Sequence, residues 1–139
     1  MSVTLYQSSI PVFVRHLDNL SGLLATGLSY AHDQEVDEAV LASARLFPNM
    51  HPLVKQVQIA CDFCKGMMAR LGGVENPKFE DNEASFADLK ARIASTRAFV
   101  EGVGEAGFAG SEDRDLTIQA GPRTLEFKGL PYLVGYALP

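Results

Sequence analysis

A helical period of apolar residues follows Pro52 and constrains the fold of this chain more than any other feature. Proline suits the first turn of a helix, where its missing N–H costs nothing, and Gly72 and Gly73 provide a stop. Between them, apolar residues recur at steps of three and four, the spacing of one buried helical face: Val54, Val57, Cys61, Cys64, Met68 and Leu71. The sequence therefore predicts a long amphipathic helix over residues 52–71.

Two further long helices are predicted from the same period. The first covers residues 5–28, and Pro11 either lies inside it or sets its true start. A short connector helix follows, for which Asp37 is the expected N-cap. The other long helix runs to Glu101, and Ser85 with Asp88 forms the expected capping box at its start. We thus expect three amphipathic helices that each need a partner face.

The helical period of apolar residues does not continue through the last forty residues. After a Gly-rich stretch at residues 102–110, residues 116–119 and 124–127 alternate in polarity around a turn at residues 120–123, which predicts a small β-hairpin. Residues 131–139 are almost wholly apolar and predict the opening of another helix that stops short. Since a bundle of this kind is most naturally closed by a fourth helix, we expect that the chain is incomplete at this end.

Length and composition limit the class of protein. The 139 residues suit a single domain, expected over 1–139, and 47% hydrophobic residues are enough for a core. A net charge of −5, with no run of Lys or Arg, does not favour nucleic acid or an anionic membrane as a partner. No segment reaches the roughly 20 apolar residues of a membrane span. We therefore expect a soluble, cytoplasmic protein.

The order of elements resembles the DinB/YfiT-like four-helix-bundle superfamily. Short motifs occur along nearly the whole chain: Leu5-Tyr6 before Pro11-Val12-Phe13, Asn19-Leu20, Ala44-Arg45-Leu46, Pro52-Leu53, Gln56-Val57 with Ala60, Tyr132-Leu133 and Ala137-Leu138-Pro139. In these motifs the chain is similar to a subfamily known as a domain of unknown function, DUF number nineteen ninety-three. The resemblance implies an all-α, up-down-down-up four-helix bundle with a small β-hairpin before the last helix, which is truncated or missing here.

The resemblance also implies a divalent metal, zinc or nickel, held by three histidines, and thiol transfer in some members. This chain departs from that pattern, because no HxxxH spacing occurs in it. Its three histidines are His16, which could turn toward the bundle interior, His32 in a polar loop, and His51, which leads into a helix. The residues themselves indicate no cofactor, and His16 and His51 are the candidate ligands if a zinc or nickel ion binds.

Cys61 and Cys64 form a CxxC motif, which invites a redox interpretation. A reactive dithiol of the thioredoxin kind sits at a helix N-terminus, where free amides lower the thiol pKa. Here the pair lies nearly three turns into a helix, on its apolar face. We therefore favour two small buried core residues over a redox site.

Several polar residues are the candidates for a binding pocket. Gln56 shares a helical face with apolar residues, so a bundle would bury its amide, which then cross-links the core or lines a pocket. Asp62 lies on the edge of that face beside Gln58, with Lys65 near it, and a solvated edge is the simpler interpretation. The predicted pocket consists of Asn19, Gln56, Asp62, Tyr132 and Tyr136.

Two functions from different classes stay open. The first is an uncharacterised, metal-free bundle protein that binds an apolar or aromatic small molecule near Gln56. We also expect it to be a homodimer, because an incomplete bundle exposes an apolar groove that a partner chain can cover. The alternative is a metal-dependent transferase or hydrolase of the DinB type. The sequence does not decide whether the protein is an enzyme, since this fold hosts many activities.

Overall fold

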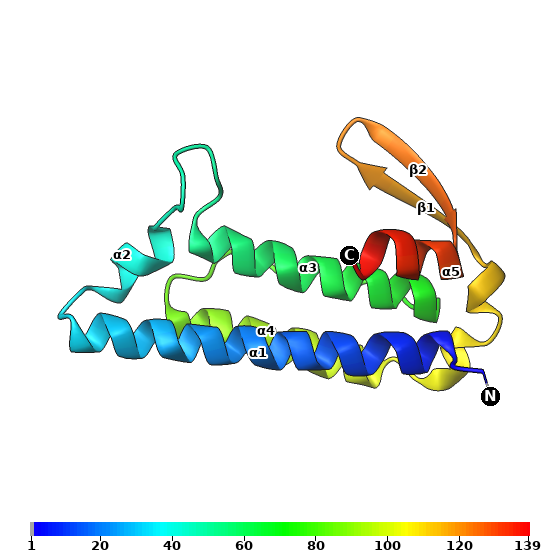
Figure 1. The fold of residues 1–139 in the computed structure, drawn as a ribbon, viewed down its shortest axis with the longest axis horizontal. Coiled ribbons are helices and arrows are strands. Elements are labelled where there is room, and N and C mark those ends of the chain that lie inside the picture. Colours follow the sequence, from blue (N-terminus) through cyan, green and yellow to red (C-terminus); the bar gives the residue numbers. More distant parts are fainter. Residues whose placement is uncertain (1) are drawn as a thin grey trace.

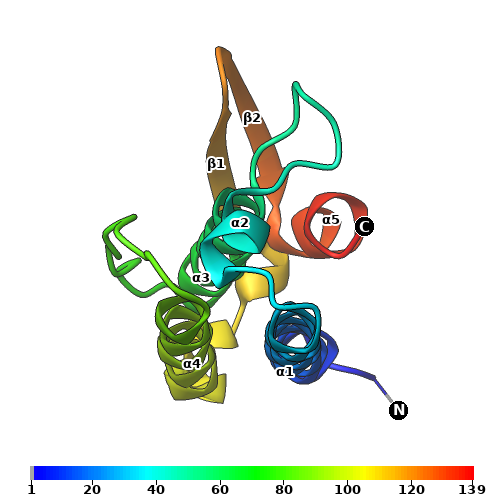
Figure 2. The same cartoon turned by 90° about the vertical axis from the view of Figure 1, so that its left-hand side faces the viewer.

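The computed structural model describes residues 2–139 and consists mostly of helices, with one small hairpin. Three long helices form the body: α1 (Leu5–Asp33), α3 (Leu53–Gly72) and α4 (Phe86–Gly102). Figure 1 shows them running along the long axis of the molecule, with the hairpin projecting near one end. Viewed along that axis, α4 lies between α1 and α3, and the C-terminal helix lies beside α1 and α3 (Figure 2). The three predicted long helices are therefore present.

Helix α1 begins at a capping box that was not predicted from the sequence. The Thr4 side chain accepts a hydrogen bond from the Gln7 backbone, and the Gln7 side chain accepts one from the Thr4 backbone. Pro11 lies inside the helix and does not set its start, since the helix begins at Leu5. Its position near the N-terminal end costs one backbone hydrogen bond without ending the helix. The helix continues to Asp33, more than a turn beyond the predicted end.

The connector and the second long helix follow the prediction. Helix α2 (Glu38–Ser43) begins at Asp37, whose carboxylate accepts a hydrogen bond from the Ala39 backbone. Helix α3 has Pro52 as its N-cap residue and ends at Gly73, which adopts the left-handed conformation with φ 65°. Glycine reaches that conformation at no steric cost. The two glycines after Leu71 therefore end the helix as expected.

Helix α4 begins at the predicted capping box of Ser85 and Asp88. The Gly-rich stretch that follows is more regular than predicted, because it contains two 3₁₀ turns, η1 (Glu105–Phe108) and η2 (Ser111–Asp113). Phe108 from η1 is buried in the core, where its ring packs edge-on against Tyr6. Short 3₁₀ turns of this kind commonly connect larger elements.

The hairpin and the C-terminal helix complete the chain. Strands β1 (Asp115–Ala120) and β2 (Arg123–Lys128) pair antiparallel and form the predicted hairpin. In its register, Leu116 lies opposite Phe127. Helix α5 (Gly129–Tyr132) continues into a π-helical turn, η3 (Leu133–Ala137). One cluster of buried apolar side chains joins the long helices to β1 and to the C-terminal helix, with Leu17, Met68, Leu89 and Leu133 among its most buried members.

Candidate functional site

An apolar groove lies between α1, α2 and α3, and we call it the α1–α3 groove. It encloses a volume of about 670 Å³. Leu24 and Phe86, both fully buried, form part of its floor, and Leu23 and Tyr30 of α1 contribute exposed apolar surface. Its lining includes the cation Arg45 and no carboxylate. The groove is therefore a concave apolar surface with a few polar groups, which is the usual composition of a small-molecule site.

Arg45, His51 and Gln56 line the groove from the loop before α3 and the first turn of α3, and Thr26 and Tyr30 of α1 add two hydroxyl groups. Arg45 Nη1 donates to the carbonyl oxygen of Met50 at 2.6 Å, and the Leu53 N–H donates to the carbonyl of Ala44 at 3.0 Å. Gln56 Nε2 donates to the carbonyl oxygen of His51 at 3.3 Å. These bonds tie the loop to its own backbone and to the start of α3.

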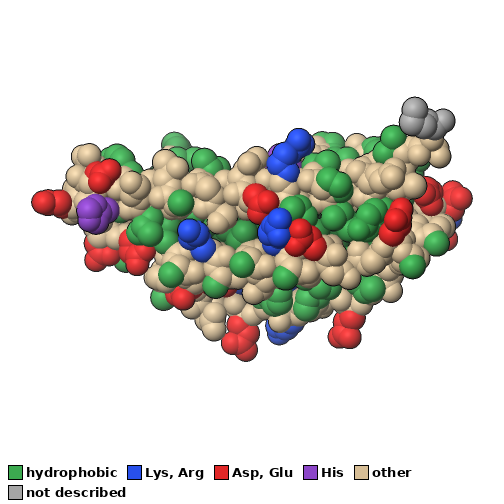
Figure 3. All heavy atoms as spheres, turned by 90° about the horizontal axis from the view of Figure 1, so that it is seen from below, with side chains coloured by type: hydrophobic (Ala, Val, Ile, Leu, Met, Phe, Trp, Pro, Cys, Tyr) green, Lys and Arg blue, Asp and Glu red, His purple; other side chains and the backbone are tan. Residues whose placement is uncertain are grey.

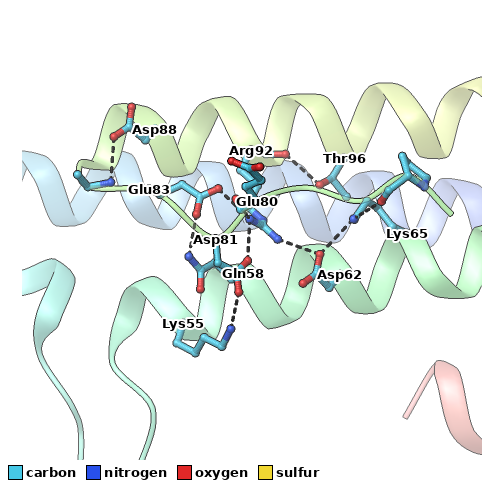
Figure 4. A network of polar contacts seen from close by, with 12 residues as sticks. Lys55, Gln58, Asp62, Lys65, Glu80, Asp81, Glu83, Asp88, Arg92 and Thr96 are labelled. Atoms are coloured by element: carbon cyan, nitrogen blue, oxygen red, sulfur yellow. Dashed lines mark hydrogen bonds and ion pairs between the residues drawn. The ribbon is translucent and has the colours of Figure 1, made fainter. Parts of the chain in front are cut away.

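A second polar cluster lies on the opposite side of α3, where α3 meets α4, and Arg92 is its centre (Figure 4). The Arg92 side chain is 2% exposed. Nη2 lies 2.9 Å from Asp62 Oδ1, and Nη1 lies 2.9 Å from Glu83 Oε1 and 3.1 Å from Asp81 Oδ1. Nη1 also donates to the carbonyl oxygen of Glu80 at 3.0 Å. The two terminal nitrogens of this buried guanidinium are thus paired with three carboxylates and a backbone oxygen.

Lys65 is a second buried cation in this cluster. It lies 3.2 Å from Asp62 Oδ1 and donates to the carbonyl oxygen of Pro77 at 2.7 Å. Its ammonium group also lies 4.0 Å from the centre of the Phe79 ring, a cation–π contact. Arg92 and Lys65 therefore tie the loop between α3 and α4 to the two helices. We call this set of contacts the Arg92 network.

The Arg92 network keeps two carboxylates ionised. A hydrogen bond from Lys55, at 2.6 Å, is the main cause that lowers the pKa of Asp81. Burial on its own would raise the pKa of Glu83, but hydrogen bonds from Arg92 and from Gln58, at 2.7 Å, outweigh it and lower the pKa. Both groups act as fixed negative charges rather than as proton donors, so the network is a structural clamp.

The structure places the five predicted pocket residues in different environments. Gln56 lines the α1–α3 groove, whereas Asp62 belongs to the Arg92 network. Asn19 is exposed on α1. Tyr132 is buried, its hydroxyl 3.3 Å from Arg70 Nη1, and it stacks with the half-buried Tyr136 at 5.8 Å between ring centres. These five side chains therefore do not converge on a single cavity.

Three expectations about individual residues are corrected. Gln56 was expected to be buried, but it is exposed, because its side chain borders the α1–α3 groove instead of entering the core. Gln58 and Lys65 were expected on a solvated edge, but both are buried, since the loop after α3 folds over them. His16 was expected to be able to turn inward, but it is exposed on α1. Arg92 was not predicted as a site residue. Its place beside the apolar residues Leu89 and Ile93 of the same helix could have indicated a buried cation that needs anionic partners.

The cysteines behave as core residues. Burial raises the pKa of the Cys61 thiol, and burial followed by the neighbouring Cys61 raises that of Cys64 to about 12. A thiol becomes a nucleophile only as a thiolate, so both are inert at neutral pH. The redox interpretation therefore has no support in the surroundings of the pair.

The described residues do not fit the metal that the superfamily resemblance implies. Within residues 2–139, no three His, Cys, Asp or Glu side chains gather as a metal would require. His51 lies at the groove, His16 is exposed on α1, and His32 pairs with its neighbour Asp33 at the far end of that helix.

The fold and the comparisons identify the class of protein. A crystal structure of a DinB family member from Shewanella denitrificans superimposes with a TM-score of 0.88 at 34% identity, covering 97% of this chain and 76% of that one. The chain is thus a DinB-like helical protein. It belongs to the family described as "Domain of unknown function (DUF1993)", which matches residues 5–139. No curated protein matches the chain.

Proposed function

We propose that this chain is a binding protein whose α1–α3 groove takes an apolar or aromatic small molecule. The observation that supports this is the groove itself, whose volume of about 670 Å³ falls in the usual range of ligand pockets, roughly 300–1,000 Å³. Its lining is mostly apolar, and polar groups among it, including Arg45, His51 and Gln56, can orient a bound molecule. The bonds within the preceding loop reduce the cost of ordering this wall on binding.

The experiment is a titration with anilinonaphthalene sulfonate, an aromatic dye whose fluorescence rises in apolar sites. Leu23 is 68% exposed and lines the groove, so Leu23→Asp removes apolar surface there without opening the core. Leu28, on the same helix and 40% exposed, lies outside the lining, and Leu28→Asp is the matched control. We expect Leu23→Asp to weaken dye binding about tenfold and the control to change it by less than about twofold.

Equal binding by the two variants, or no binding by the parent protein, would contradict the proposal. Unfolding curves of both variants are recorded beside the titrations, because a loosened fold also binds this dye.

The metal-dependent transferase or hydrolase is not favoured by any arrangement of the described residues. The homodimer and the cytoplasmic location stay predictions. No helix within residues 2–139 combines the length and the apolar character that crossing a membrane requires.

A further inference from the structure

The loop between α3 and α4, residues 73–85, is attached to the rest of the protein by polar contacts, and we call it the strap. Its backbone is irregular throughout, and each of its residues is exposed or half-buried. The buried apolar cluster contains Met68 of α3 and Leu89 of α4, so these two helices pack on each other without the strap. A loop of about this length without secondary structure is uncommon in a compact domain and usually has a function.

The strap runs back along α3, over the line where α3 meets α4, which we call the seam (Figure 4). The Pro77 carbonyl oxygen accepts a hydrogen bond from Lys65 Nζ at 2.7 Å, and Glu83 Oε2 accepts one from Gln58 Nε2 at 2.7 Å. The half-buried ring of Phe79 has its centre 4.0 Å from Lys65 Nζ. Lys65 and Gln58 are about two turns apart, so the strap covers the seam over that distance.

Two carboxylates of the strap face cations on the helices. Asp81 lies 2.6 Å from Lys55 Nζ of α3 and 3.1 Å from Arg92 Nη1 of α4. Glu83 lies 2.9 Å from the same Arg92 nitrogen. Arg92 is almost completely buried, so its charge depends on these partners in place of water. The strap is therefore held closed by charge, whereas the helices are held by apolar contacts.

We propose that the strap is a latch that opens as a unit when Asp81 and Glu83 take up protons, while α1, α3 and α4 stay packed. Protonation removes the negative charges that face Lys55 and Arg92, and a buried cation that loses its counter-charges favours hydration. Opening of the strap admits water to Arg92, so it relieves this penalty. The apolar contacts between the helices do not titrate and persist in the open state.

Linkage gives the direction of this switch. Asp81 and Glu83 have lowered pKa values while the strap is closed. A carboxyl whose pKa is lower in the closed state than in the open state binds a proton more tightly in the open state, so acid favours opening. The other charged groups around the strap are Lys78 and Glu80 within it, Asp62 and Lys65 of α3, Asp88 of α4, and Glu38 of α2, which accepts a hydrogen bond from the Phe86 backbone.

Opening changes the charge of the seam. Asp62 belongs to α3 and stays in contact with Arg92 and Lys65 when the strap leaves. Lys55 and Arg92 lose Asp81, and Arg92 also loses Glu83. The opened seam therefore carries three cations and one of the three carboxylates that had faced them. This device is separate from the α1–α3 groove, which lies on the other side of α3.

The test follows the strap and the helices in the same sample. The chain contains no tryptophan, so Phe79→Trp places a single indole in the strap, next to Lys65. Its fluorescence emission reports the state of the strap, and far-ultraviolet circular dichroism reports the helices. In this background, Glu83→Gln removes one of the two titrating groups. Glu75→Gln changes an exposed carboxylate of the same strap and is the matched control.

We expect the emission to shift to longer wavelength below about pH 4.5, at a pH where the helical circular dichroism keeps its neutral value. Glu83→Gln should shift the emission already at neutral pH and make its pH dependence shallower, and Glu75→Gln should preserve the titration. A single transition of both signals would overturn the proposal, and so would a titration that Glu83→Gln leaves unchanged.

Pepsin digestion in acid tests the parent protein without any substitution. An opened strap exposes an extended segment around Phe79, whereas packed helices resist cleavage. We expect the first cut within residues 73–85, at a pH where the circular dichroism is still helical. A first cut inside α1, α3 or α4 would contradict a latch that opens before the helices do.

Discussion

Arg92 Nη2 lies 2.9 Å from Asp62 Oδ1, and this contact joins α4 to α3 across a separation of thirty residues. Asp62 is half exposed, whereas the Arg92 side chain is almost completely buried. The carboxylate therefore reaches in from the rim to a cation that the core encloses. The stability of the fold and its response to acid depend on this arrangement, in which the buried partner carries the positive charge.

Removal of the Arg92 side chain should destabilise the protein strongly. Arg92→Ala leaves Glu83, whose side chain is 7% exposed, without its guanidinium partner, and a buried unpaired charge is costly. We expect a loss of about 3 kcal/mol in the free energy of unfolding, measured with urea. Arg97→Ala, on the same helix, removes an exposed cation paired with Asp18 and Glu101 and should leave the midpoint almost unchanged. Similar losses in the two variants would mean that the Arg92 network contributes no more than surface charge does.

Arg97 is a suitable control because its side chain, 38% exposed, lies at the surface. On the face built by α1 and α4, acidic and basic side chains are interspersed over the surface, among hydrophobic ones (Figure 3). Ion pairs in such a setting are screened by water and salt.

Acid should weaken the fold through the same network. The pKa values of Asp81 and Glu83 are lowered, so these groups stabilise the fold above their unfolded pKa values, and that stability is lost as the pH falls through the folded ones. We expect a flat stability from neutral pH to about pH 5 and a decline below about pH 4.5. Glu83→Gln should reduce stability at neutral pH and make the acid decline shallower. Glu126→Gln, an exposed position on β2, is the control and should preserve the parent profile.

The two thiols should be unreactive in the folded protein. Burial raises the pKa of Cys64 to about 12 and also raises that of Cys61, so hardly any thiolate is present at about pH 8. We expect dithionitrobenzoate to react with neither cysteine until denaturant is added, and then with both. Rapid reaction of the native protein would restore the redox interpretation of the CxxC motif.

Gly129 should tolerate no side chain. A Cβ at this position would lie 1.8 Å from the carbonyl oxygen of Ser111, a backbone atom that cannot easily move away. Gly129→Ala should therefore cost about 2 to 3 kcal/mol through overpacking where α5 meets η2. A Cβ at Gly135 in η3 would meet no atom within 4 Å, so Gly135→Ala should be neutral or slightly stabilising. Thermal unfolding of the pair distinguishes a steric effect from a general sensitivity of the C-terminal helix.

We expect the purified protein to bind no zinc or nickel ion in the way that the superfamily resemblance implies. Purified protein supplied with zinc and nickel and then gel-filtered should retain far less than one equivalent by mass spectrometry, since no suitable donor cluster lies within residues 2–139. Near one equivalent of a single metal, reduced by His51→Ala, would favour the enzyme alternative. His32→Ala is the control, because His32 is exposed at the end of α1.

Local signals in the chain predicted the elements well. Ser85 and Asp88 marked the start of α4, Gly72 and Gly73 marked the end of α3, and alternating residues marked the hairpin. Each of these signals acts over a few residues, through a cap, a backbone conformation or a side-chain period. Such interactions are complete within one segment, so they can be recognised without knowledge of its neighbours.

The candidate site could not be predicted in the same way. Gln56 and Asp62 lie on one helix, yet one borders the α1–α3 groove and the other binds Arg92 from α4. The partners of Asp62 and Lys65 come from distant segments, and the burial of Lys65 depends on how the loop after α3 folds back. The amino-acid order alone was sufficient for the long helices, for most of their ends and for the family, although it missed the extension of α1 to Asp33. Packing decided which polar residues became buried, because burial depends on what other segments place over a side chain.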